Sequence, residues 1–278
     1  MNQRLTRRRF AQMAIASTTV AGLGYFANKT FAQNQLTLYG ARPDSKAGAV
    51  FLQALNLVTN TVEDLTTTPL DIGEKLIGLT SLADGIVLAI GAARTGKKEN
   101  APTRLVFLAK SPRNVTLSGL KKQEGLESLQ GANDGSLIGL VNRKNNQSAV
   151  KLVNINTSNG EITLNNKIKL TATKRFSELA QVSNSTIYTI DVGQEGEVTL
   201  VSLDLGQDRV IQRAQLKFNN EVWNSGLSDL VGYSANQIFA LGAPRYESPN
   251  NLYTVDASTG NMTLLREFDV TKITLLRA

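Results

Sequence analysis

One stretch of the sequence, residues 226–268, reads GLSDLVGYSANQIFALGAPRYESPNNLYTVDASTGNMTLLREF and decides the fold. Its apolar residues fall into four short runs, which are Leu227–Val231, Gln237–Leu241, Leu252–Asp256 and Met262–Phe268. Gly, Asn, Ser and Asp separate the runs, and short runs rich in Val, Ile, Leu, Tyr and Thr between such turns are typical of antiparallel strands. The stretch therefore predicts four strands joined by turns.

The same pattern recurs upstream at a nearly constant spacing. The tetrapeptide Leu227–Leu230 has counterparts at Leu76–Leu79, Leu126–Leu129 and Phe176–Leu179, at spacings of 50, 50 and 51 residues. A fifth, incomplete copy contains Leu36–Tyr39. A fixed period of this length indicates a repeat architecture. Residues 33–278 are therefore interpreted as five repeats of four strands each.

The second strand of each repeat is apolar on nearly every residue, as Ile86–Ile90 and Ile238–Leu241 illustrate. Such strands are buried on both faces, and radial sheets that stack on their neighbours supply that environment. The predicted fold is all-β, a five-bladed β-propeller of four-stranded antiparallel blades. A β-sandwich or an open solenoid is the alternative.

Closure of the ring depends on the last residues of the chain. Ile273–Leu276 is the candidate for the missing strand beside Leu36–Tyr39. If the two segments pair, both ends of the domain share one blade and no sheet edge is left open. If they do not pair, one blade has three strands.

The repeat at residues 226–260 resembles a blade of the YVTN, NHL and PQQ-like propeller repeats. The resemblance covers residues 33–278 and implies a propeller. Because these families share the blade pattern while their activities differ, it implies no specific function.

Residues 1–32 form a separate unit. Thr6-Arg7-Arg8-Arg9-Phe10 precedes a mild apolar run, and Thr30-Phe31-Ala32 offers small residues at a cleavage position. This order resembles a twin-arginine signal peptide, and the run is too short and polar for a membrane anchor of about 20 residues. We expect export to the periplasm or the extracellular space, with the thylakoid lumen left open. An ordinary basic amphipathic helix is the alternative.

Composition removes several classes of function. The chain has no His and no Cys, which excludes imidazole bases, thiol nucleophiles and Cys/His zinc sites. Five basic residues and no acidic residue lie in residues 1–32, so the remainder carries 25 basic and 23 acidic groups. That balance argues against a nucleic-acid footprint. No cofactor, no stable membrane anchor after cleavage and a monomer are expected.

Acidic residues in the first strands are the candidates for chemistry. Glu178 and Asp229 occupy equivalent positions in successive repeats, nearest the axis, with Glu127 in the strand before them. Paired carboxylates catalyse glycoside hydrolysis. Gly78 and Ser128 occupy the equivalent positions in two other repeats and interrupt the ring of acids.

Basic residues are the candidates for binding. Arg42, Arg94, Arg143 and Arg245 each follow a second strand, and Lys174 and Arg175 lie in a connector between repeats. All of these loops open on one face of a propeller, here called the connector face. An Arg fork suits a carboxylate or phosphate ligand, and a solvated surface is the alternative.

Two further features are candidates for ligand or metal binding. Trp223, the one Trp of the chain, precedes a first strand and is either a ligand platform at the rim or part of the core. Asp191, Glu195 and Glu197 are a weak calcium candidate that matches no calcium-loop spacing.

The favoured function is an exported, non-catalytic propeller that binds a protein partner, an anionic glycan or a small anion on its connector face. The alternative is a glycoside or lactone hydrolase that uses Glu178 and Asp229 in the central channel. The lack of His and Cys and the interrupted ring of acids favour binding.

Overall fold

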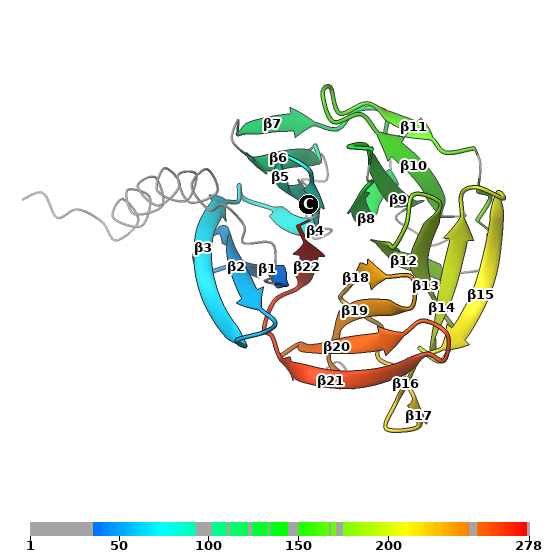
Figure 1. Cartoon of the computed structure of the whole chain (residues 1–278). Helices are drawn as coiled ribbons and strands as arrows, with labels where there is room; N and C mark the ends of the chain where they lie inside the picture. Colours follow the sequence, from blue (N-terminus) through cyan, green and yellow to red (C-terminus); the bar gives the residue numbers. More distant parts are fainter. Residues whose placement is uncertain are drawn as a thin grey trace, which may run out of the picture.

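The computed structural model describes residues 36–92, 102–109, 112–121, 124–132, 134–143, 150–166, 168–170, 175–244 and 249–276. These residues form five antiparallel sheets around a central axis, so the predicted five-bladed β-propeller is confirmed (Figure 1). Within the described ranges there is no α-helix, and correspondingly no helix long and apolar enough to cross a membrane. The predicted signal, residues 1–32, lies outside them.

Each blade runs from an inner strand near the axis to an outer strand. Blade 1 contains β22 (Lys272–Leu275), β1 (Thr37–Asp44), β2 (Ala49–Asn56) and β3 (Thr61–Pro69). Blade 2 contains β4 (Glu74–Leu82), β5 (Gly85–Ala92), β6 (Arg104–Ala109) and β7 (Arg113–Thr116). Blade 3 contains β8 (Glu124–Gly131), β9 (Leu137–Arg143), β10 (Lys151–Ile155) and β11 (Ile162–Leu164).

The last two blades follow the same order. Blade 4 contains β12 (Arg175–Gln181), β13 (Thr186–Val192), β14 (Val198–Asp204) and β15 (Arg209–Gln215). Blade 5 contains β18 (Asp229–Ser234), β19 (Gln237–Gly242), β20 (Asn251–Asp256) and β21 (Asn261–Glu267). The hairpin β16 (Lys217–Phe218) and β17 (Glu221–Val222) joins the outer edge of β21 by a parallel pairing and projects from the ring (Figure 1).

One strand of the fifth repeat begins later than the sequence predicted. The predicted first strand is Leu227–Val231, whereas β18 begins at Asp229. The reason lies in the preceding backbone: the carbonyl of Ser228 accepts a hydrogen bond from Lys272 Nζ at 2.8 Å. The Ser228 amide still donates to the Leu241 carbonyl of β19 at 2.7 Å, but because a side chain uses the Ser228 carbonyl, the strand pairing ends at this residue. Residues 225–228 contribute to a pocket wall.

The C-terminal strand closes the ring. β22 pairs antiparallel with β1, with Leu38 opposite Leu275 and Ala41 opposite Lys272. The prediction that the end of the chain supplies the missing strand beside Leu36–Tyr39 is therefore confirmed. β22 takes the innermost position of blade 1, between β4 and β18 (Figure 1).

The core is divided among the blade interfaces. Five clusters of buried apolar side chains each join two neighbouring blades, including blades 5 and 1. The second strands contribute fully buried residues such as Ile86, Leu137 and Ile190. Burial of each such side chain stabilises the fold by about 1.5–3 kcal/mol, so every blade depends on both of its neighbours.

Candidate functional site

The inner strands β8 and β12 carry the acidic residues on β-bulges. Glu178 is the extra residue between Ser177 and Leu179 in the pairing of β12 with β13. Glu127 is the corresponding extra residue in the pairing of β8 with β9. A bulge bends its strand and changes the direction of a side chain. The bulge in β8 falls on Glu127, one residue before the position that sequence spacing aligned with Glu178.

The backbone of Glu178 adopts a left-handed conformation. Its φ angle is 52°, which is uncommon for a residue other than Gly and costs about 1–3 kcal/mol. Such a conformation persists only where the surrounding contacts hold it. Here the Glu178 carboxylate accepts a hydrogen bond from Lys272 Nζ at 2.9 Å.

Lys272 brings the two predicted acids together. Its ammonium lies 2.9 Å from Glu178 Oε2 and 4.0 Å from Asp229 Oδ1. The side chains of Lys272, Glu178 and Asp229 are 12%, 9% and 7% exposed. The three residues come from blades 1, 4 and 5 and form a buried charged cluster, which we call the axial triad.

Asp229 also holds the closing strand through its backbone. Asp229 Oδ2 accepts a hydrogen bond from the Ile273 amide at 2.7 Å. The side chain of Asp229 in β18 therefore contacts both the Ile273 amide and the Lys272 ammonium. Through these contacts the triad holds β22 against blade 5 at two successive residues.

The charges of the triad do not balance, since two carboxylates face one ammonium. Burial raises the pKa of Glu178 well above its ordinary value; Lys272 opposes the rise and the charge of Asp229 adds to it. Burial also raises the pKa of Asp229, against the opposing effects of Lys272 and the Ile273 amide. Burial lowers the pKa of Lys272, but the two carboxylates outweigh it and the net direction is upward. Lys272 is therefore charged, and the two acids retain a proton to higher pH than isolated carboxyl groups.

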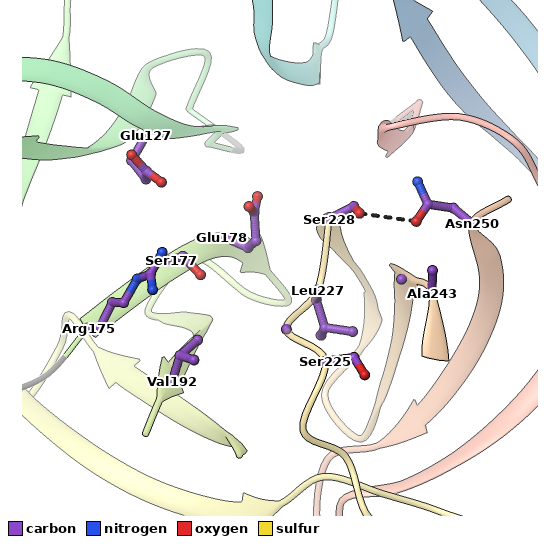
Figure 2. Close-up of a pocket in the computed structure, with 12 residues that line it drawn as sticks. Glu127, Arg175, Ser177, Glu178, Val192, Ser225, Leu227, Ser228, Ala243 and Asn250 are labelled. Carbon is purple, nitrogen blue, oxygen red and sulfur yellow. Dashed lines mark hydrogen bonds between the residues drawn. The ribbon is translucent and has the colours of Figure 1, made fainter. Parts of the chain in front are cut away.

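A pocket of about 360 Å³ opens beside Glu178 on the connector face, between blades 4 and 5. Figure 2 shows Glu178 and Glu127 turned toward one open space, with Ser228 and Asn250 on its other side. Polar groups make up much of the lining: Glu127, Arg175, Ser177, Glu178, Ser225, Ser228 and Asn250. Asp229 and Lys272 do not line it. Of the two predicted acids, therefore, only Glu178 lines the pocket.

The predicted ring of Arg residues is described only in part. Arg94, Arg245 and Lys174 lie outside the described residues, and only the backbone of Arg143, the last residue of β9, is described. Arg42 lies in β1 of blade 1 and does not line the pocket; it pairs with Asp269 at 3.6 Å and lies 6.0 Å from the centre of the Phe51 ring. Arg175 is exposed at the start of β12 and lines the pocket.

Trp223 is part of the core. Its side chain is buried, its indole N–H donates to the Gly226 carbonyl at 2.6 Å, and its ring packs edge-on against Tyr253 and Phe218. Of the two interpretations of this residue, the structure places it in the core of the interface between blades 4 and 5. It offers no exposed ring face to a ligand.

The three acids of the weak calcium candidate do not converge. Asp191 lies in β13, while the Glu197 carboxylate accepts a hydrogen bond from the Glu195 amide within the following turn. In the part of the chain that the structure describes, no group of three Asp or Glu side chains is arranged to hold a metal ion.

Sequence reasoning missed Lys272 and the polar lining residues Ser177, Ser225, Ser228 and Asn250. One signal for Lys272 was present, because it immediately precedes the segment predicted to close the ring nearest the axis. A charged residue on such a strand needs a buried partner. The lining residues carry no such signal.

Comparisons with known proteins do not assign the chain to a family. No family model matches the chain, and no curated protein matches it. Among solved structures it is similar to a protein of unknown function from Bacteroides caccae, with 11% identity and a TM-score of 0.48, covering 88% of this chain and 99% of that one. It is also similar to an oligogalacturonate lyase in complex with manganese, with 13% identity and a TM-score of 0.46, covering 83% and 65%.

A third similar structure is a puromycin-hydrolysing peptidase from Mycobacterium tuberculosis, with 14% identity and a TM-score of 0.46. The match covers 82% of this chain and 36% of the peptidase. The chain thus spans less than two thirds of the lyase and of the peptidase. Likenesses at this level say nothing about the site or its function.

Proposed function

We propose that the protein is an exported, non-catalytic β-propeller that binds a ligand or partner on its connector face, with the pocket beside Glu178 as the binding centre. One observation carries the proposal: polar side chains from β8, β12, the connector before β18 and the residue before β20 converge on a single pocket of about 360 Å³. Ligand sites of this kind are concave and hold a few polar groups that fix orientation.

The positions of the acids favour binding over hydrolysis. A glycoside hydrolase of the paired-carboxylate type needs both acids to reach the scissile bond. Asp229 does not line the pocket, and its oxygens engage the Ile273 amide and the Lys272 ammonium. Glu178 and Asp229 therefore both contact the closing strand β22.

The position of Arg175 favours a ligand that carries an anionic group. It is exposed where β12 begins and lines the pocket, so its guanidinium is available to a carboxylate or phosphate. A protein partner that covers the connector face and inserts an acidic side chain here satisfies the same chemistry.

Ligand-induced stabilisation tests the proposal. The purified protein is heated with neutral sugars, anionic glycans, phosphates, lactones or calcium, and a pull-down from the exported fraction tests a protein partner. A ligand at about 100 times its dissociation constant adds about 2.7 kcal/mol, a rise of about 5–10 °C in Tm for a domain of this size. Arg175→Ala should remove the shift, and Lys217→Ala, on the distant β16 hairpin, should not. Shifts that persist in Arg175→Ala, together with an empty pull-down, contradict this site.

A second candidate function, hydrolysis, rests on Glu178 itself. A buried carboxyl group with a raised pKa that lines a pocket has the properties of a general acid. Turnover of chromogenic glycosides or lactones that disappears in Glu178→Gln would favour this function, whereas binding without turnover favours the first.

Export is proposed from residues 1–32 alone. Replacement of Arg7 and Arg8 by Lys should retain the protein inside the cell if the twin-arginine signal directs it. Unchanged export of that variant contradicts this route.

A further inference from the structure

Two walls of the pocket are joined by a segment that does not line it. Figure 2 shows Glu178 on one side of the open space, with Ser228 and Asn250 on the other side and a hydrogen bond between these two residues. Residues 270–273, here called the closing segment, follow β21 and lead into β22. None of them is among the residues that line the pocket.

The closing segment contacts both walls through hydrogen bonds. Lys272 Nζ donates to Glu178 Oε2 at 2.9 Å and to the Ser228 carbonyl at 2.8 Å. The Val270 carbonyl accepts a hydrogen bond from Asn250 Nδ2 at 2.7 Å. The other atom of that amide, Asn250 Oδ1, lies 3.2 Å from Ser228 Oγ. Three lining residues, from blade 4, the connector and the residue before β20, are thus held by two residues of the closing segment.

The same segment attaches the strand that closes the ring. The Thr271 amide donates to a carbonyl of β1 at 2.9 Å, and the Ile273 amide donates to Asp229 Oδ2 at 2.7 Å. Alternate residues of the segment therefore have different partners. Val270 and Lys272 contact residues of the pocket, whereas Thr271 and Ile273 contact β1 and β18.

Local opening near a chain end requires less free energy than global unfolding. If the closing segment detaches, Glu178 and Ser228 lose the ammonium that joins them, and Asn250 loses its acceptor. The left-handed backbone of Glu178, with a φ of 52°, also depends on surrounding contacts to hold it. Detachment therefore removes contacts of three lining residues at once.

We propose that Lys272 and Val270 are positioning residues of the pocket, so that the shape of the pocket and the attachment of β22 form one cooperative unit. The inference rests on the proposed function, because it names what controls the proposed binding site. Two coupled sites affect each other by the same factor. A ligand that fills the pocket therefore strengthens the attachment of β22, and the loss of a contact at either end loosens the other end.

Amide hydrogen exchange of the purified protein tests the coupling in both directions without a ligand. Lys272→Met removes the bridge between the walls. Exchange of the Phe268 amide, which donates to the Asn250 carbonyl at 2.9 Å, should then accelerate about ten-fold or more. Asn250→Asp keeps an acceptor for Ser228 but replaces the donor to Val270 by an oxygen, so exchange of the Ile273 amide should accelerate by a similar factor. Neither reporting amide bonds to the altered side chain.

Matched controls separate the coupling from a general loss of stability. Asn261→Asp makes the same chemical change at the exposed start of β21, and Lys217→Met removes an exposed cation of β16. Neither control should alter the exchange of the Phe268 or Ile273 amide. The amides of β10 in blade 3 report global unfolding, and both effects must exceed the change seen there. If Lys272→Met does not fold, Asn250→Asp decides the inference alone.

Two anions extend the test to an occupied pocket. Inorganic phosphate and D-glucuronate are the probes, because the exposed Arg175 favours an anionic group. A probe that binds only the assembled pocket, present at about 100 times its dissociation constant, should slow exchange of the Ile273 amide by about ten- to 100-fold. Its affinity should fall in Asn250→Asp and stay unchanged in Asn261→Asp.

Several results would overturn the inference. Unchanged exchange of the reporting amides in both variants, or acceleration no greater than that of β10, shows that the pocket and the closing segment are independent. A probe that binds and leaves exchange of the Ile273 amide unchanged rejects the coupling, while the proposed function stays intact. If neither anion binds and the wider panel and the pull-down are empty, the proposed function fails, and the exchange results of the two variants decide the inference on their own.

Discussion

Lys272 and Glu178 form a buried ion pair across the propeller axis, with Nζ and Oε2 2.9 Å apart, although the two residues are 94 positions apart in the chain. One residue belongs to the strand that closes blade 1 and the other to a bulge of blade 4. The contact links the closure of the ring to the residue that faces the pocket. The closure of the ring and the wall of the pocket therefore share one group of side chains.

Replacement of Lys272 by Met tests the cost of leaving the two acids unpaired. Removal of one partner of a buried ion pair typically costs about 3–5 kcal/mol, and we expect a loss of this size in urea unfolding at pH 8. Without the cation, the pKa values of both carboxyl groups rise further, so the loss should shrink as the pH falls toward 5. Lys217→Met, on the exposed β16, serves as the control. An equal loss at both pH values contradicts the expected electrostatic origin.

Replacement of Glu178 by Gln tests the pH dependence of stability. The folded pKa of Glu178 lies well above the ordinary value of 4.5, so the folded state binds this proton more tightly than the unfolded state. The stability that comes from this tighter proton binding is fully present below pH 4.5 and is lost as the pH rises through the folded pKa of Glu178. An amide mimics the protonated acid. The free energy of unfolding of Glu178→Gln, measured from pH 5 to 8, should therefore fall less than that of the natural protein.

Asp229 contributes a pH effect of the same sign, so some slope should remain in Glu178→Gln. If the natural protein shows no decline in stability above pH 5, or the variant shows the same decline, then Glu178 is not the group that titrates.

Replacement of Asp229 by Ala tests the attachment of β22. The change leaves the Ile273 amide without its 2.7 Å acceptor, and an unsatisfied buried donor costs about 1–3 kcal/mol. We expect faster hydrogen exchange of the Ile273 and Thr274 amides and earlier proteolysis near the C-terminus, with blade 3 unaffected. Asp229→Asn keeps an acceptor oxygen and should show a smaller effect. Identical exchange in both variants would argue against a role of this hydrogen bond in ring closure.

Replacement of Gly260 by Ala tests the contact between the outer strands of blades 4 and 5. Gly260 has a φ of 75°, and an added Cβ would lie 2.2 Å from the Gln215 carbonyl oxygen. Gly135 has a similar φ of 82° with no atom within 4 Å of such a Cβ. Gly135→Ala should therefore cost only the backbone strain of about 1–2 kcal/mol, and Gly260→Ala should cost more. If both variants lose the same stability in thermal unfolding, the backbone near Gln215 adjusts to the added Cβ at no cost in stability.

Much of the fold follows from local pattern. The apolar runs around Ile86, Leu137 and Ile238 predicted their strands because a strand buried on both faces needs apolar residues at every position. The boundary of β18 was missed because the Ser228 carbonyl is taken by Lys272, a residue 44 positions away. A distant side chain that competes for a backbone group leaves no mark in local sequence.

The candidate site was accessible from sequence only in outline. Spacing placed Glu178 and Asp229 near the axis, and the structure brings both to Lys272. Spacing also aligned Ser128 with Glu178, whereas the β-bulge in β8 falls on Glu127. A bulge shifts the register by one residue, and repeat spacing does not reveal which residue is the extra one.

The sequence by itself determined the five repeats, most of the strands within them and the candidate segment for closing the ring, because strand formation depends on residues close together in the chain and is repeated at a fixed period. Only the tertiary structure decided that Asp229 faces the closing strand, that Glu178 faces the pocket and that Trp223 belongs to the core. Those outcomes depend on burial and on charges contributed by blades 1, 4 and 5. Residues so far apart in the chain become neighbours only when the ring closes.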